Sequence, residues 1–202
     1  MENMSASSST IAEPTWDIAY LFPRQGQWSE DEYLALDTNR LVEFSHGILE
    51  VLSMPTQSHQ LIVLYLYQLL SLFTNKMGTF LWAPLRVQLW PGKIREPDVV
   101  LMLAAHDERR GDRYWRGADL VIEVVSPDDR RRDYEVKRRE YARANIPEYW
   151  IVDQQEAAIL VLTLENGRYL ENGRFQTGEV ATSKLLDGFT VEVTAVFEAA
   201  KQ

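Results

Sequence analysis

The chain has 202 residues, a formal net charge of −9 and no cysteine. This length suits one globular domain with a buried core. The lack of cysteine excludes disulfides, thiolate metal sites and cysteine nucleophiles. The acidic balance argues weakly against a polyanionic partner, but the charges are uneven, because residues 93–143 carry 13 basic and 12 acidic side chains.

The N-terminal segment, residues 1–14, is rich in serine and lacks the basic start and apolar block of a signal peptide. We expect it to be a disordered tail in front of a single domain over residues 15–202. The longest apolar stretch, residues 61–73, is too short and too interrupted for a membrane helix. We therefore expect a cytoplasmic protein with no membrane partner.

In the first half of the chain, a Ser-x-x-Glu capping box at residue 29 predicts a short helix. Residues 41–44 and 48–52 then predict two strands joined by a tight His-Gly turn. Residues 56–76 repeat apolar side chains with the period of a helix. Residues 79–90 predict one long strand or a bent pair of strands.

In the second half, two segments with short apolar runs, 95–101 and 119–127, predict buried strands on either side of a charged loop. An amphipathic helix follows over residues 131–145. The remaining predicted elements are a strand at 148–153, a hairpin of 158–164 with 168–170, and a strand at 189–193 before a frayed C-terminus. This order indicates an α/β (α+β-like) domain, with a mixed sheet flanked by helices.

Both buried strands contain an acid where a purely structural strand would not have one. Asp98 begins the first, and Glu123 lies in the middle of the second. A carboxylate on a buried strand must be paired, protonated or bound to a metal. Oxygen ligands of this kind suit Mg²⁺, so the two acids predict a shared metal site.

Lys137 is the candidate catalytic cation. On a helical wheel it shares one quadrant with Tyr134 and Tyr141, on the stripe that should face the sheet. The alternative is that its stem passes these rings to reach solvent or to pair with Asp133, four residues earlier. The presence of Asp98 and Glu123 favours a functional lysine.

Several of these residues, taken together, resemble the Uma family of restriction-endonuclease-like proteins, within the PD-(D/E)XK nuclease fold. The resemblance spans about residues 28–195 and rests on an ordered set of segments. They are Glu43 to Gly47, Ser58-His59, Glu96-Pro97-Asp98, Ile122 to Pro127, Asp133 to Lys137, and Pro147 to Asp153.

The resemblance implies a restriction-endonuclease-like domain and a metal-dependent phosphodiester hydrolase, with Asp98 and Glu123 as metal ligands. The usual pattern places a lysine two residues after the second acid, where this chain has Val125. Lys137 matches the lysine that the family carries on the next helix. The implied cofactor is Mg²⁺ or Mn²⁺, and the implied partner is nucleic acid, with DNA favoured. A homodimer follows from the way restriction-type nucleases cut two strands with two subunits.

Three further residues have open roles. His59 begins the long helix and could act as a neutral ligand or a water-orienting base, since a helix N-terminus disfavours its protonated form; the alternative is a core histidine or cap. Glu43 is a possible accessory acid, as is Glu50. For nucleic-acid contacts we expect arginines beside the site: Arg131, Arg138 and Arg139. A second hypothesis is a catalytically silent nuclease-fold protein that binds nucleic acid or a protein partner.

Overall fold

The computed structural model describes residues 22–38, 40–73, 77–126 and 129–201. Its centre is a six-stranded sheet in the order β11-β10-β9-β8-β6-β3. These strands are β3 (Gly78–Trp82), β6 (Val99–Leu103), β8 (Leu120–Val124), β9 (Glu148–Asp153), β10 (Ala158–Glu165) and β11 (Arg168–Gln176). The β8–β9 pair is parallel and the others are antiparallel, which confirms the predicted mixed sheet.

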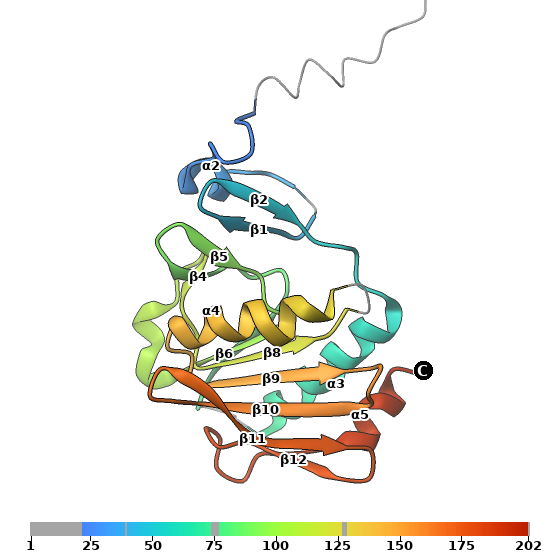
Figure 1. The fold of residues 1–202 in the computed structure, drawn as a ribbon. Coiled ribbons are helices and arrows are strands. Elements are labelled where there is room, and N and C mark those ends of the chain that lie inside the picture. Colours follow the sequence, from blue (N-terminus) through green and yellow to red (C-terminus); the bar gives the residue numbers. More distant parts are fainter. Residues whose placement is uncertain (1–21, 39, 74–76, 127–128, 202) are drawn as a thin grey trace, which may run out of the picture.

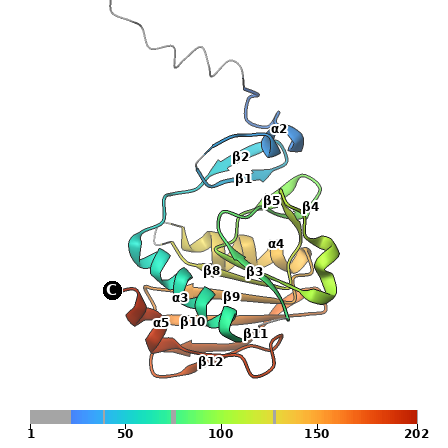
Figure 2. The same ribbon diagram turned by 180° about the vertical axis from the view of Figure 1, so that it is seen from behind.

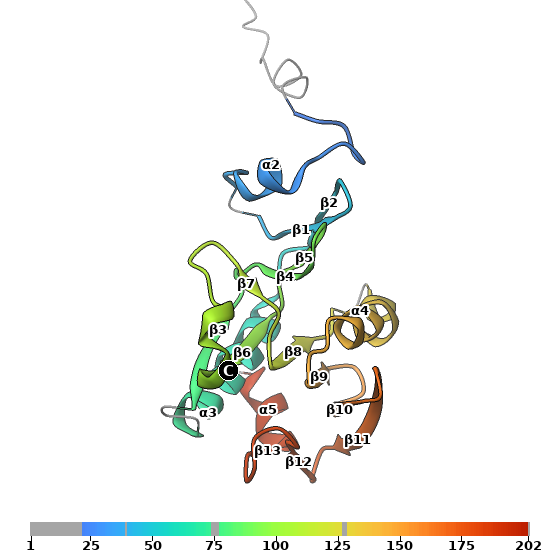
Figure 3. The ribbon, with the colours of Figure 1, turned by 90° about the vertical axis from the view of Figure 1, so that its left-hand side faces the viewer.

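Helices cover both faces of this sheet (Figure 1). The long helix α3 (Gln57–Phe73) and the short α5 (Val193–Ala199) lie on one face, and α4 (Arg138–Arg143) lies on the other (Figures 2 and 3). Side chains of a strand alternate between the faces. Leu120 and Ile122 therefore pack in the core under α3, while Val121 packs in the core under α4.

A second sheet lies beside the first, in the order β2-β1-β5-β4-β7. Its strands are β1 (Val42–Ser45), β2 (Ile48–Val51), β4 (Val87–Trp90), β5 (Lys93–Arg95) and β7 (Trp115–Arg116), and the capped helix α2 (Glu30–Leu34) packs near it. The β1–β2 hairpin turns at His46 and Gly47, which have φ of 46° and 85°, as a tight turn with two left-handed residues requires. Residues 79–90 form the bent pair, β3 and β4, one in each sheet.

Two C-terminal features differ from the sequence prediction. The strand β13 (Thr190–Glu192) pairs with β12 (Val180–Thr182), which was not predicted. The chain then continues as α5 rather than fraying. Val193 and Val196 bury this helix in the same core as Leu66 of α3, and this tertiary contact stabilises a helix too short to be stable alone.

The helix predicted over residues 131–145 is irregular. Arg132–Lys137 forms a π-helical segment, and Arg138–Arg143 continues as α4. The 3-10 helix η1 (Ala104–Arg109) occupies part of the predicted charged loop. Single π-helical turns are rare and occur frequently at functional sites, and this one contains Asp133 and Lys137.

The N-terminal tail predicted at residues 1–14 lies outside the described residues, as does Pro127. The described helices include none that is both long and apolar enough to cross a membrane.

Candidate active site

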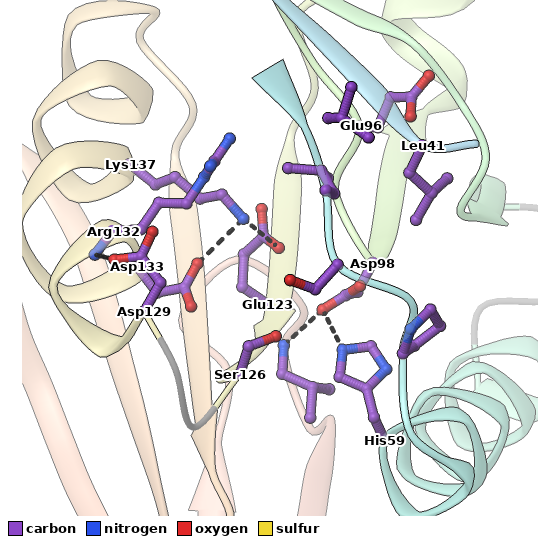
Figure 4. A pocket seen from close by; sticks show the side chains of 15 residues that line it. Leu41, His59, Glu96, Asp98, Glu123, Ser126, Asp129, Arg132, Asp133 and Lys137 are labelled. Carbon is purple, nitrogen blue, oxygen red and sulfur yellow. Dashed lines mark hydrogen bonds and ion pairs between the residues drawn. The ribbon is translucent and has the colours of Figure 1, made fainter.

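The strand register brings the two predicted acids together. β6 and β8 pair antiparallel with Val99 opposite Ile122, so the next position of this register places Asp98 opposite Glu123. Directly opposed residues point to the same face and have Cβ atoms roughly 4.5–5.5 Å apart. Both side chains line one cavity of about 240 Å³ at this end of the strands (Figure 4).

Lys137 enters the same cavity from the opposite side. Its Nζ lies 2.8 Å from Oε2 of Glu123 and 3.0 Å from Oδ1 of Asp133. The lysine therefore reaches a strand acid and also forms the pair with Asp133 that the alternative interpretation expected. The carboxylates outweigh the effect of burial and raise the pKa of Lys137, so the ammonium stays charged.

Tyr141 fixes the other oxygen of the strand acid. Its hydroxyl donates to Oε1 of Glu123 at 2.5 Å. The sequence stripe that contains Lys137 and Tyr141 thus faces the sheet as predicted, although Tyr141 does more than fill the core. Tyr134 is partly buried against the same core as Tyr141, and its hydroxyl donates to Asp153 at 2.8 Å.

His59 lies at the start of α3 with its ring against Asp98. Its Nε2 is 3.1 Å from Oδ2 of Asp98, and the same oxygen accepts the backbone N–H of Val124 at 2.7 Å. Burial lowers the pKa of His59, but the hydrogen bond and charge of Asp98 outweigh it, so the pKa is raised. The helix N-terminus was expected to disfavour the protonated form, but the carboxylates of Asp98 and Glu123 favour it.

Glu43 is fully buried, as an inward-facing acid should be, but it does not line the cavity. Its carboxylate accepts from the guanidinium groups of Arg95 and Arg132. Glu50 also bonds both arginines, at 2.8 Å each. The two accessory acids are therefore engaged in an ion-pair cluster that connects the β1–β2 hairpin to the π-helical segment.

The arginines expected beside the site point elsewhere. Arg131 pairs with Glu135 on the surface, and Arg138 lies 3.6 Å from Glu171. Arg139 donates to a backbone carbonyl of its own helix. Arg132, which the sequence analysis passed over, is the arginine that lines the cavity, together with Asp133.

The cavity is short of positive charge. Burial raises the pKa of Glu123 to about 8, and the charges of Asp98 and Asp133 add to this effect while Lys137 opposes it. The pKa of Asp133 is also raised, mainly by burial. Five carboxylates thus line the cavity with two permanent side-chain cations, Arg132 and Lys137, and such a cluster favours a further cation.

The carboxylate oxygens of Asp98 and Glu123 suit a hard divalent cation, and the protein would supply only part of its coordination shell. Oδ1 of Asp98 accepts no hydrogen bond from the described residues, and each oxygen of Glu123 uses one of its two lone pairs. No group of three or more His, Asp or Glu side chains spaced for a metal occurs in the part of the chain that the structure describes. Mg²⁺ commonly takes one or two carboxylates and fills its remaining positions with water and phosphate.

The raised pKa values predict how the metal-free protein responds to pH. A carboxyl whose folded pKa exceeds its unfolded value stabilises the fold below the unfolded pKa, and this contribution is lost as pH rises through the folded pKa. For Glu123 this window runs from 4.5 to about 8, and the raised pKa of His59 acts in the same direction. In EDTA we expect the free energy of unfolding to fall across this window, by at most about 1.4 kcal/mol per pH unit for each group.

Thermal unfolding with EDTA and with Mg²⁺ at several pH values measures this effect. The stabilisation by Mg²⁺ should be larger at pH 8 than at pH 6, because the cation competes with the proton on Glu123. The Glu123→Gln variant should show a flatter pH profile. A parent profile without slope between pH 5 and 8 would contradict this description of the cavity.

Comparisons with known proteins give the family of the chain and support its fold. The sequence model of the Uma2 family, described as "Putative restriction endonuclease", matches residues 30–194. One similar crystal structure, from Anabaena variabilis, is described as a "putative nuclease belonging to DUF820". It superposes with a TM-score of 0.71 at 15% identity, over 86% of this chain and 99% of that one, and so supports the fold. A comparison with curated proteins found no match. The chain belongs to the Uma2 family.

Proposed function

We propose that this protein is a Mg²⁺- or Mn²⁺-dependent endonuclease that hydrolyses phosphodiester bonds of nucleic acid, with DNA as the favoured substrate. The observation that carries the proposal is the meeting of Asp98, Glu123 and Lys137 in one cavity. Family membership supports the same class of reaction. We extend the proposal to a cytoplasmic homodimer, since two subunits would be needed to cut both strands of a duplex together.

Asp98 and Glu123 would hold the metal in this proposal. When bound, a divalent cation supplies charge neutralisation at the phosphate and lowers the pKa of a bound water. Asp98 would be held in position by His59 and by the N–H of Val124. Glu123 would be held by Tyr141. Because Nε2 of His59 is committed to Asp98, we assign His59 a positioning role.

Lys137 would act as a fixed positive charge. It is too strongly held in the protonated state, between Glu123 and Asp133, to serve as a general base. A charged ammonium at this position can orient the attacking water or stabilise charge that develops on the phosphate. Asp133 would in turn keep the ammonium aimed into the cavity.

A catalytically silent nucleic-acid or protein-binding scaffold is the competing function. The net charge of −9 favours it, whereas a cavity with excess carboxylate favours the enzyme. Incubation with single-stranded DNA, duplex DNA and RNA distinguishes the two. The enzyme should cleave at least one of them with Mg²⁺ or Mn²⁺ and none with EDTA, and Mn²⁺ should raise its thermal stability. A scaffold should bind without cleavage and show no shift with Mn²⁺.

A further inference from the structure

A second, apolar cavity opens beside the catalytic one. It has a volume of about 170 Å³ and shares His59 and Asp98 with the cavity described above. Its walls are mainly apolar, from Met54, Trp82 and Pro84. We call it the Trp82 cavity.

The apolar side chains around this opening are unusually exposed. Trp82 ends β3 with 47% of its surface accessible, and Met54 is 75% accessible. A tryptophan that only filled the core would be covered. The ring of Trp82 is nevertheless held in place, because the ring of Tyr67 packs against it edge-on with centroids 4.4 Å apart. The result is a supported aromatic face next to Asp98.

A third cavity adjoins both of the others: it shares Leu41 and Pro84 with the Trp82 cavity, and Leu41 and Glu96 with the catalytic cavity. It has a volume of about 330 Å³ and is lined by Arg40, Arg86 and Arg113, with Glu96 and Asp112. Arg40 and Arg113 are exposed and form no ion pair with any other residue that the structure describes. Guanidinium groups in this state suit phosphate oxygens.

We propose that the Trp82 cavity receives one unstacked base of the substrate strand, from the nucleotide next to the scissile phosphate. This inference rests on the proposed function and names its substrate class. The three cavities meet at Leu41. A nucleotide with the scissile phosphate in the acidic catalytic cavity could therefore place its base in the apolar cavity and its other phosphate against the arginines. Aromatic side chains stack any base without reading its sequence, and the exposed Gln60 in the same wall offers amide hydrogen bonds to its edge.

The proposal makes unpaired nucleic acid the preferred substrate. A base in a duplex must leave its stack and its partner before it can enter such a cavity, whereas a base in a single strand has no partner to lose. A protein partner on this surface is disfavoured, because it would cover the opening shared with His59 and Asp98.

The test uses one fluorescent oligonucleotide in three forms: single-stranded, duplex, and single-stranded with an abasic nucleotide moved along the strand. Binding and Mg²⁺-dependent cleavage are measured for the parent and for Trp82→Ala. With the parent we expect a loss of about 10-fold to 100-fold when the missing base lies beside the cleaved bond. Trp82→Ala should lose binding and cleavage of the intact strand by the same factor, and its binding and cleavage should not depend on where the abasic nucleotide lies.

Two variants control for folding and for general loss of apolar surface. Trp82→Tyr keeps an aromatic ring and should recover most of the binding. Leu72→Ala removes an exposed apolar side chain from α3, outside the cavity, and should behave as the parent does.

The failures are distinguishable. If the parent cleaves the abasic strand as fast as the intact strand at every position, the base site is wrong and the nuclease remains. If no form is cleaved, the proposed function fails. The base site is then decided by binding alone, from the affinities of the parent and of Trp82→Ala for the intact and abasic strands. If Trp82→Ala instead changes the oligomeric state and leaves binding unaltered, the surface is an interface between copies, and the proposal is overturned.

Discussion

Replacing Asp98 by Asn is expected to abolish cleavage, with a loss of about 10³-fold or more, because the contribution of a catalytic cation is several kcal/mol. The metal-free variant should be at least as stable as the parent. Asn can accept the N–H of Val124 through its carbonyl oxygen, and the substitution removes one of the carboxylates that crowd the cavity. Cleavage assays and thermal unfolding in EDTA measure the two effects.

Asp119 offers a matched control for this substitution. It is buried, and it accepts a backbone N–H from Leu103 at 2.7 Å and bonds the ring of His106 at 2.8 Å. Asp98 has the same two kinds of partner, but only Asp98 lines the catalytic cavity. Asp119→Asn should retain cleavage at any temperature at which it is folded. If Asp98→Asn remained active, the assignment of Asp98 as a metal ligand would be wrong.

Replacing Lys137 by Ala should also abolish cleavage, and unlike Asp98→Asn it should destabilise the fold. The substitution leaves Glu123 and Asp133 buried without their shared cation, a change that typically costs about 3–5 kcal/mol. Activity is therefore compared at a temperature where circular dichroism shows both proteins folded. Lys137→Arg should keep the charge but fit poorly between two carboxylates, since a guanidinium is a planar fork, and we expect weak activity at best.

Lys93 is the control for the loss of a buried lysine. Its Nζ lies 2.9 Å from Glu140 and 3.1 Å from Oγ of Ser45, away from the catalytic cavity. Lys93→Ala also removes a buried lysine, but Glu140 keeps its ion pair with Arg95, so it should lose less stability than Lys137→Ala, and it should keep its cleavage rate. Full activity in Lys137→Ala would place the lysine among the structural ion pairs and favour the silent scaffold.

The pair of strand acids could be predicted from the sequence because the signal is local. An acid inside an apolar strand is anomalous in itself, and two such strands that neighbour each other in a sheet bring their acids to one face. The hairpin turns at His46-Gly47 and Asn166-Gly167 were also predictable from a local signal, a dipeptide that ends in glycine between two strands. In the structure all four residues have positive φ, as a tight turn requires.

The environment of Lys137 could not be predicted to the same detail. A helical wheel assumes 3.6 residues per turn, whereas the π-helical segment Arg132–Lys137 has i→i+5 hydrogen bonds and a wider turn. Positions before Lys137 are therefore rotated, and Asp133 joins the inward face, where it is buried, while Tyr134 stays only partly buried against the core. Asp133 was visible only as a local partner of the lysine.

The ion-pair partner of Glu43 and the helix at the C-terminus depend on tertiary contacts. Glu43 faces inward as its apolar neighbours indicated, but its partner Arg95 is far away in the sequence, and only the pairing of β1 with β5 brings them together. The helix α5 depends on a core contact with α3. The contact of Glu43 leaves no periodic signal in its own segment. The apolar residues of α5 (Val193, Val196 and Phe197) do have helical spacing, but over only two turns.

The most direct test of the central claim is a crystal structure of the protein soaked in Mn²⁺, with anomalous scattering to locate the metal. We predict a peak in the cavity between Asp98 and Glu123, about 2.1–2.3 Å from a carboxylate oxygen of each, as expected for a small hard cation. The peak should be absent from Asp98→Asn crystals prepared in the same way. A cavity without Mn²⁺, in crystals of protein that cleaves nucleic acid when Mn²⁺ is added, would contradict the proposed site.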